Sequence, residues 1–267
     1  MILLNTDFED ITSVKIKLTN NCNFGCDYCF FKRKSGFISL ETIDKLITKI
    51  HDIKNLDITL YGGEPLLHNN IVQIVDKLHQ YGNIGIETNG FINKNFDKLK
   101  DYDIKWSFTY HLNHNDTLTP IINKAKQLKN YEIVFILSKD NQDVVYKKYN
   151  ILKKYFNCVL TYVFQDLNYI NKKYIEHDNN LIYITNNKIY HTDNITMIQN
   201  GITDFSGKKC DCGFNHIVLD CDGKIYRCEP YFVNRDSIGT IDTFNFYTYR
   251  QKCASKWCTD YWRKISD

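Results

Sequence analysis

Apolar and polar positions alternate with two different periods along the first 165 residues. Short runs with period two, typical of strands, are separated by stretches in which apolar residues recur every three to four positions, typical of helices. The run Val14–Leu18 alternates apolar residues with lysines, whereas Ser39–Ile53 places Ile43 and Ile50 on one face of a helix that Ser39 can cap. The two periods together predict a fold of the α/β class.

Six β/α units follow one another in this pattern. The expected strands are Val14–Leu18, Leu56–Tyr61, Asn83–Thr88, Ile104–Tyr110, Glu132–Leu137 and Cys158–Phe164, and the expected helices span 39–53, 71–78, 93–100, 120–129 and 143–156. Such repetition favours parallel strands joined by right-handed crossovers. Because six units are too few for a closed eight-stranded barrel, we expect an open, partial (β/α)6 barrel over residues 1–170.

The pattern changes after about residue 167. The stretch Leu181–Tyr190 predicts a β-hairpin that turns at Asn186 and Asn187, and cysteines become frequent from Lys208 onward. We therefore expect a connecting hairpin region over residues 171–207 and a small C-terminal domain over residues 208–267.

Charge and composition limit the functional classes. The 34 basic and 31 acidic residues leave a net charge of +3, which argues against a nucleic acid held by charge alone. The chain opens without a basic start and an apolar run, and no segment approaches the ~20 apolar residues that cross a bilayer, so we expect neither a signal peptide nor a membrane partner. Ten cysteines without a secretion signal indicate a reducing cytoplasm and metal ligands instead of disulfides.

Three cysteines are crowded into the run Cys22-Asn-Phe-Gly-Cys26-Asp-Tyr-Cys29, with C-x3-C-x2-C spacing. Three thiolates can hold three irons of a cubane [4Fe–4S] cluster and leave the fourth iron open to a small molecule. Zinc sites usually pair cysteines as C-x2-C with a second pair further along. A structural zinc knuckle or three chance cysteines are the alternatives.

The turn Gly62-Gly63-Glu64-Pro65 follows the second expected strand. Two glycines let the backbone approach a ligand closely, and Glu64 can accept hydrogen bonds from an ammonium group. On its own this stretch is better explained as a simple turn.

Polar residues also follow the third and fourth expected strands. Asn89 and Ser107 offer hydrogen-bonding groups, and His111 is a candidate acid or base, with a purely structural histidine as its alternative. Because the C-terminal ends of parallel strands meet at one mouth of a barrel, these groups and the cysteine run are expected to lie together.

With aromatic Tyr28 just before its last cysteine, the run resembles the cluster loop of the radical S-adenosylmethionine (SAM) superfamily. The resemblance implies the same (β/α)6 architecture and an open iron that chelates SAM. It implies an electron from a flavodoxin- or ferredoxin-type donor, cleavage of SAM to a 5′-deoxyadenosyl radical, and abstraction of a hydrogen atom from the substrate. By position it implies SAM contacts at Tyr28, Gly62, Gly63, Glu64, Pro65, Asn89, Ser107 and Val163.

The C-terminal region holds a second set of cysteines: Cys210, Cys212, Cys221, Cys228, Cys253 and Cys258. Gly223–Cys228 is similar to the G-x4-C element of the auxiliary-cluster domains called SPASM and twitch. The resemblance implies one further [4Fe–4S] cluster held by Cys210, Cys228, Cys253 and Cys258, with Cys212 or Cys221 spare or exchanged into the set.

Two features qualify that second site. The sequence ends nine residues after Cys258, which favours the shorter twitch-like form, and the C-x4-C pair departs from the commoner C-x2-C. A zinc site made by the same thiolates is the alternative. Cys158, on an expected strand, is interpreted as a buried small hydrophobe.

The resemblance leaves the substrate open. Family members with such C-terminal domains modify ribosomally made peptides, and others act on small metabolites. About a dozen residues precede the first strand, so a leader-binding winged-helix domain is not expected. A peptide is the favoured substrate, and dehydrogenation, epimerisation or rearrangement of a metabolite, sugar or nucleotide is the alternative. A non-catalytic iron–sulfur or zinc protein is the other class.

Overall fold

The computed structural model describes residues 12–29, 31, 35–53, 56–112, 114, 118–138, 140–162, 206–207, 209–254 and 265–266. Val163, Cys258 and the predicted hairpin Leu181–Tyr190 lie outside these described residues. None of the helices in the described ranges is long and apolar enough to cross a membrane.

Strands and helices alternate through the first part of the described chain. The strands are β1 (Thr12–Thr19), β2 (Leu56–Gly62), β3 (Gly82–Thr88), β4 (Ile104–Tyr110), β5 (Tyr131–Leu137) and β6 (Cys158–Tyr162). The helices are α1 (Leu40–Ile50), the 3-10 turn η1 (Pro65–Leu67), α2 (Ile71–Leu78), α3 (Phe96–Leu99), α4 (Leu118–Ala125) and α5 (Gln142–Leu152). Each expected strand and helix of this region is present, with bounds that differ by at most a few residues.

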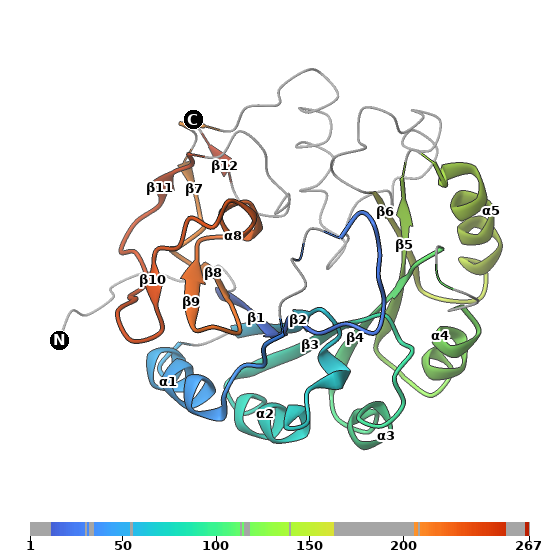
Figure 1. Ribbon diagram of the computed structural model, residues 1–267, viewed down its shortest axis with the longest axis horizontal. Helices are drawn as coiled ribbons and strands as arrows, with labels where there is room; N and C mark the ends of the chain where they lie inside the picture. The colour runs from blue at the N-terminus through green and yellow to red at the C-terminus, as the bar shows by residue number, and fades with distance from the viewer. Residues whose placement is uncertain are drawn as a thin grey trace.

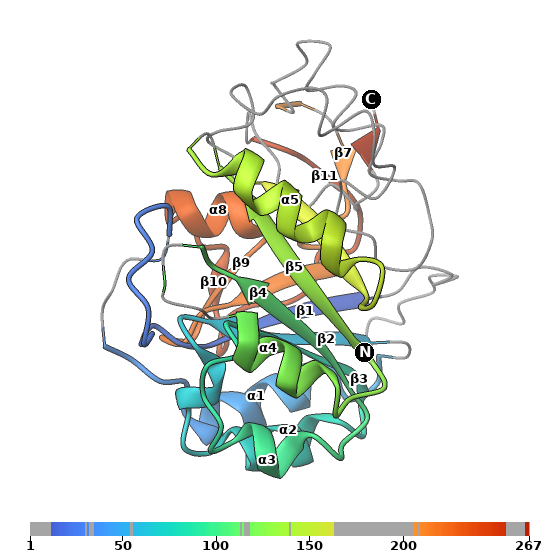
Figure 2. The same cartoon turned by 90° about the vertical axis from the view of Figure 1, so that its right-hand side faces the viewer.

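These six strands lie side by side in chain order, and each pairs in parallel with the next. The sheet curves, and α1 to α5 lie along its outer side (Figure 1). Figure 2, turned by 90°, shows α4 and α5 lying over β4 and β5 on that outer side. The prediction of a partial barrel of parallel strands is therefore confirmed.

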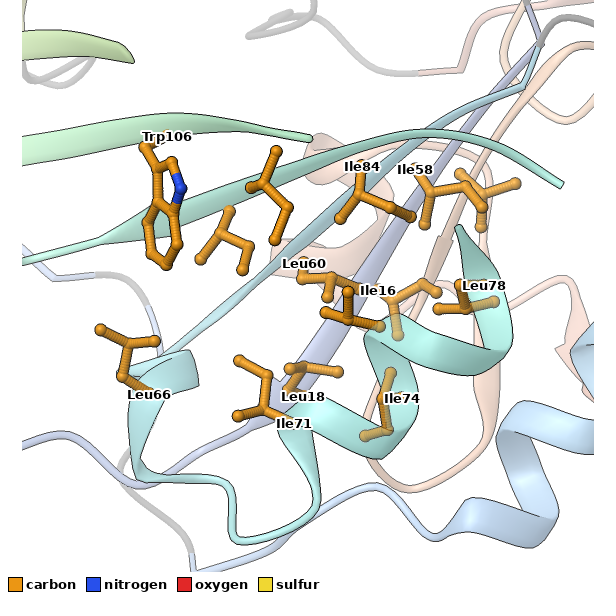
Figure 3. Packing of buried hydrophobic residues seen from close by; sticks show 14 of the residues in the cluster. Ile16, Leu18, Ile58, Leu60, Leu66, Ile71, Ile74, Leu78, Ile84 and Trp106 are labelled. Atoms are coloured by element: carbon orange, nitrogen blue, oxygen red, sulfur yellow. The ribbon is translucent and has the colours of Figure 1, made fainter. Parts of the chain in front are cut away.

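The hydrophobic core lies between the sheet and the outer helices. Val14, Ile16 and Leu18 of β1 are fully buried and belong to the same apolar cluster as the buried face of α2. Figure 3 shows side chains of β1, β2 and α2 meeting there, with Trp106 of β4 at the edge of the view. Ser39 caps α1 by accepting a hydrogen bond from the Thr42 main chain at 3.0 Å, as predicted.

The C-terminal segment extends the same sheet. Strand β8 (His216–Leu219) pairs in parallel with β1, and the hairpin of β8 with β9 (Lys224–Tyr226) leads on to β10 (Gly239–Thr240). In the described chain this gives a nine-stranded sheet in the order β10-β9-β8-β1-β2-β3-β4-β5-β6. The region after residue 208 is thus joined to the barrel by main-chain hydrogen bonds.

Three short strands form a second, smaller sheet in the order β11-β7-β12, from β7 (Lys209–Cys210), β11 (Gln251–Lys252) and β12 (Ile265–Ser266). A short helix, α8 (Glu229–Asn234), follows β9 and ends at Arg235 in the left-handed conformation. Cys228 is the residue before α8, so this helix starts directly at one of the predicted cluster ligands.

Candidate functional site

The three N-terminal cysteines lie in the loop that leaves the C-terminal end of β1. Cys22 and Cys29 are exposed and Cys26 is half-buried. The loop is folded on itself, since the Cys29 main chain donates to the Cys26 carbonyl at 3.1 Å and the Phe24 main chain donates to the Cys22 sulfur at 3.3 Å. Although Cys22 is exposed as a residue, partial desolvation in the folded loop raises the pKa of its thiol, and the neighbouring Cys26 and Cys29 act in the same direction. Three close thiols in an open loop suit the iron–sulfur cluster that the sequence predicts.

The glycine pair at the end of β2 is packed against the start of this loop. The Gly63 main chain donates to the Thr19 carbonyl at 2.8 Å, and the Glu64 main chain donates to the Asn21 carbonyl at 2.8 Å. A Cβ on Gly63 would stand 2.2 Å from the Asn21 oxygen, and one on Gly62 would stand 2.5 Å from the Thr19 oxygen. The close backbone approach that requires glycine is therefore an approach to the chain itself.

Glu64 is completely buried and joins the ends of β2 and β3. One carboxylate oxygen accepts from the Leu66 main chain at 3.0 Å and from the Thr88 hydroxyl at 2.7 Å, and the other accepts from the Asn89 main chain at 2.9 Å. Burial raises the pKa of Glu64, and these three donors oppose that rise. Three of the roughly four acceptor positions of the carboxylate are thus used by the chain.

Replacing Glu64 by glutamine tests this arrangement. The amide nitrogen would face a donor, so we expect Glu64→Gln to lower the free energy of unfolding by about 1–3 kcal/mol. Denaturant unfolding measures the change. Glu41→Gln, on the exposed surface of α1, is the matched control and should change stability by less than about 0.5 kcal/mol. Equal effects of the two substitutions would show that the buried contacts contribute little.

Asn89 brings the end of β3 to the cysteine loop. Its side-chain amide donates to the Asn23 side chain at 2.8 Å and lies 3.9 Å from the Cys22 sulfur. Asn89 and Ser107 are both buried, and Ser107 is the register partner of Glu87 on the neighbouring strand β3. The structure therefore brings Asn89 to the cysteines, while Ser107 lies on β4.

His111 lies against the cysteine loop from the end of β4. Its Nδ1 is 2.6 Å from the Tyr28 hydroxyl and 3.5 Å from the Cys26 sulfur. Burial and the nearby His114 lower the pKa of His111 to about 4, and burial raises the pKa of Tyr28. His111 is therefore neutral near pH 7, and its catalytic role remains a prediction.

His114 is a neighbour of the cysteines that the sequence did not single out. Its Nε2 is 3.4 Å from the Cys26 sulfur, and its ring stacks on Phe24 with centroids 4.1 Å apart. The sequence signal was the second histidine three positions after His111.

The inner side of the sheet carries charged side chains beside a buried cluster of Tyr61, Val218, Tyr226 and Phe232, unlike the layers of branched apolar side chains that fill a closed barrel. Since Val14, Ile16 and Leu18 face the helices, Lys15 and Lys17 face inward. Lys15 pairs with Glu87 at 3.4 Å and with Glu229 of α8 at 2.9 Å.

Further ion pairs continue this lining, between Lys17 and Asp220 at 3.6 Å and between Lys105 and Glu132 at 3.2 Å. Burial lowers the pKa of Lys17, and Asp220 opposes that change. These pairs place a carboxylate beside each of Lys15, Lys17 and Lys105. The alternating lysines of β1 were the sequence signal for this lining, which the motif search did not use.

Four of the C-terminal cysteines gather in one buried group: Cys210, Cys212, Cys228 and Cys253. Hydrogen bonds from Cys212 and Cys253 lower the pKa of Cys210, and hydrogen bonds to Cys210 and Cys228 raise the pKa of Cys212. Within the described ranges, no three His, Cys, Asp or Glu side chains converge on a point where a single metal ion could bind. Four buried thiols in one group are a ligand set that either a [4Fe–4S] cluster or a zinc ion can use.

The two remaining described cysteines lie elsewhere. Cys221 accepts a hydrogen bond from the Asn20 side chain at 2.9 Å and packs against the main core, and Cys158 is half-buried on β6. Burial raises the pKa of both thiols to about 12. The structure thus separates Cys221 from the four-thiol group and brings Cys212 into it.

Curated relatives match the N-terminal part of the chain. The probable GTP 3′,8-cyclase of Methanothermobacter marburgensis is 36% identical over 85 residues, 30% of this chain and 28% of that protein. The GTP 3′,8-cyclase of Staphylococcus haemolyticus is 34% identical over 112 residues, 36% of this chain and 32% of that protein. The match therefore spans less than a third of the length of either relative.

Solved structures match more of the chain at lower identity. A histidine-tagged form of anSMEcpe with bound AdoMet has a TM-score of 0.66 and 18% identity, over 90% of this chain and 80% of that one. Streptococcus suis SuiB bound to S-adenosylmethionine has a TM-score of 0.58 and 15% identity, over 88% of this chain and 62% of that one. At these identities the likeness shows the fold alone.

A sequence model of a protein family identifies the superfamily to which the barrel belongs. The model described as the Radical SAM superfamily matches residues 16–169, which include the cysteine loop, the glycine turn and all of β2 to β6. This match covers more than half of the 267 residues, and the chain therefore belongs to the radical SAM superfamily.

Proposed function

We propose that this radical SAM enzyme modifies a peptide and uses an auxiliary [4Fe–4S] cluster for electron transfer. When bound, the cluster at Cys22, Cys26 and Cys29 supplies the electron that cleaves SAM to the radical that takes a hydrogen atom from the substrate. The chain's own residues then hold the cofactors, orient the substrate and keep water out. A flavodoxin- or ferredoxin-type protein as electron donor is part of this proposal.

The proposed SAM site lies at the ends of β2, β3 and β4, beside the cysteine loop. The turn Gly62–Pro65 is assigned to the amino group of SAM, Asn89 and Ser107 to its ribose and carboxylate, and Tyr28 with Val163 to its adenine. Supporting this, Glu64 and Asn89 are tied to each other and, through Asn21 and Asn23, to the cysteine loop. The Glu64 carboxylate, completely buried and bonded three times to the chain, holds this turn in place beside the cysteine loop.

The main support for a peptide substrate is how much of the chain shares its fold with anSMEcpe. The fold likeness covers 90% of this chain and so includes the C-terminal region, whereas the GTP 3′,8-cyclase of Staphylococcus haemolyticus matches 36%. One of the similar structures is native anSMEcpe with bound AdoMet and the Kp18Cys peptide. The inward lysines at positions 15, 17 and 105 are each paired with a carboxylate, which favours a substrate with little net charge.

A nucleotide is the second candidate. The curated relatives named GTP 3′,8-cyclase reach 36% identity, about twice that of the similar solved structures, although over a shorter stretch. A triphosphate would need cations that are not already matched by carboxylates.

The proposal is tested by anaerobic reconstitution with iron, sulfide, dithionite and SAM. We expect release of 5′-deoxyadenosine, and a rise in its rate when a pool of synthetic peptides is added but not when GTP is added. Mass spectrometry of the peptides then identifies the changed residue. Stimulation by GTP alone would replace the peptide proposal, and no 5′-deoxyadenosine under any condition would contradict the activity.

The auxiliary cluster is assigned to Cys210, Cys212, Cys228 and Cys253, which share one buried group. Cys258, in the set that the resemblance implied, remains a prediction outside the described residues. Two clusters predict about eight irons per reconstituted chain. Iron and sulfide analysis of Cys212→Ser and Cys221→Ser tests this assignment. We expect about four irons per chain in Cys212→Ser and about eight in Cys221→Ser. Stoichiometric zinc in the parent protein would contradict an auxiliary cluster.

A further inference from the structure

Arg227 precedes Cys228 and is enclosed among the four thiols of the C-terminal group, with only 5% of its surface exposed. An arginine side chain has five N–H donors, and here all five are used. Nε donates to the Cys212 carbonyl at 3.0 Å, and one terminal nitrogen donates to the Tyr231 hydroxyl at 3.1 Å and to the Lys252 carbonyl at 3.0 Å. The other terminal nitrogen donates to the Gln251 carbonyl at 3.3 Å and to the Cys210 sulfur at 3.6 Å.

None of these five partners is a carboxylate. A buried guanidinium stays charged and is costly to bury unless a negative group lies near it. The one partner that becomes anionic on binding metal is the sulfur of Cys210. The chain therefore holds a positive charge where four thiolates are proposed to surround a cluster.

The guanidinium is also held in place by aromatic rings. It lies 5.1 Å from the centroid of Tyr231 and 5.7 Å from that of Tyr247. Gly213, at φ +86°, makes room for the second ring, since a Cβ there would stand 2.6 Å from Tyr247. Contacts from α8, from β11 and from the loop after β7 hold the Arg227 guanidinium in place. Its positive charge therefore does not need to move when the proposed cluster gains or loses an electron.

We propose that Arg227 is a positioning residue that donates to the Cys210 thiolate and raises the reduction potential of the auxiliary cluster. The inference rests on the proposed function, because it needs that cluster to be present. When the oxidised cluster takes up one electron, its net charge falls by one, and a fixed cation beside its sulfur ligands stabilises the reduced form. Hydrogen bonds to the sulfurs act in the same direction.

Potentiometric titration followed by electron paramagnetic resonance tests the proposal. The full chain carrying Cys22→Ala, Cys26→Ala and Cys29→Ala serves as background, so that the auxiliary cluster alone is observed. In this background Arg227→Met removes both the positive charge and the hydrogen-bond donors. Arg227→Gln removes the charge and keeps an amide donor, whereas Arg227→Lys keeps the charge and loses the planar guanidinium. Lys252→Met is the matched control, because it removes an exposed cation one residue from Cys253.

We expect Arg227→Met to make uptake of the electron at least about tenfold less favourable, a fall of about 59 mV in midpoint potential. The midpoint potential should fall less in Arg227→Gln and least in Arg227→Lys. Lys252→Met should change the equilibrium for electron uptake less than about twofold. Unchanged potentials in iron-containing Arg227→Gln or Arg227→Met would overturn the inference. If Arg227→Met fails to bind iron, Arg227→Gln and Arg227→Lys decide, and equal potentials in these two would overturn it as well.

The failure of the proposed function is distinguishable from these outcomes. If no auxiliary cluster exists, the background protein itself will contain no iron and show no resonance signal, whatever stands at position 227.

Discussion

The triple variant Cys22→Ala, Cys26→Ala and Cys29→Ala is expected to lose all SAM cleavage and to retain about four irons per chain. The open iron that binds SAM exists only if three thiolates hold the other irons, so no part of the reaction survives their loss. All three side chains lie exposed or half-buried in the loop after β1, so their replacement removes no packing from the core. The fold and the C-terminal group of thiols should therefore remain.

Iron and sulfide analysis and the yield of 5′-deoxyadenosine measure this result, and circular dichroism checks the fold. Cys158→Ala is the matched control, because Cys158 is a half-buried thiol on β6, away from both groups. It should keep about eight irons and the full rate of SAM cleavage. SAM cleavage by the triple variant at the rate of the parent would show that the loop does not hold the reactive cluster.

The barrel could be predicted from local pattern because each of its strands and helices satisfies its own period. The helix Ile71–Leu78 and the strand Ile104–Tyr110 have the bounds that the pattern predicted. In the helix, Ile71, Ile74, Val75 and Leu78 are all buried, so that the apolar stripe and the packing agree. Alternation of strands and helices then leaves few topologies open.

The extension of the sheet by β8 could not be predicted in this way. His216–Leu219 is a four-residue run that is buried throughout, and such a run has no alternation to show which face meets the core. Its partner β1 lies about 200 residues earlier in the chain, as the register of Val14 with Ile217 shows. Long-range parallel pairing depends on the whole fold and leaves no local signal.

The parts of the candidate site that depend on residue spacing within one segment could be predicted from the sequence. The contacts between distant segments could not. The spacing of Cys22, Cys26 and Cys29 indicated a cluster, and their loop is now placed beside the glycine turn. The sequence could not show that Glu64 is bonded to Thr88 and Asn89, because those donors come from the end of another strand. The sequence set Cys212 and Cys221 apart together as spare cysteines and could not distinguish them, since a sequence does not show which thiols a turn brings together.

Cys228→Ala is expected to stop product formation while leaving reductive cleavage of SAM largely intact. A cluster with four cysteine ligands has no open iron, so its proposed task is to accept an electron from the substrate radical. Hydrogen abstraction precedes that transfer, and 5′-deoxyadenosine therefore still forms when the acceptor is lost. The alternative is that the cluster only stabilises a small domain, as structural metals often do.

The contacts of the segment around Cys228 indicate that the Cys228→Ala variant stays folded. The hairpin of β8 and β9 is joined to β1 by main-chain pairing, and Glu229 of α8 pairs with Lys15 of β1 at 2.9 Å. Neither contact involves a thiol, so the segment around Cys228 remains attached to the barrel when the cluster is lost. Losing the side chain of Cys228, which is 3% exposed, still removes one member of the buried four-thiol group.

The decisive measurement is the ratio of product to 5′-deoxyadenosine in soluble Cys228→Ala, with Cys221→Ala as the control from the same hairpin. A ratio near zero at a normal yield of 5′-deoxyadenosine supports electron transfer, because only the step after hydrogen abstraction has failed. Equal retention of both products would refute the redox role. Loss of both, together with sensitivity to protease, would assign the cluster to structure, because a misfolded C-terminal segment would carry Glu229 and α8 away from the inner face of the barrel.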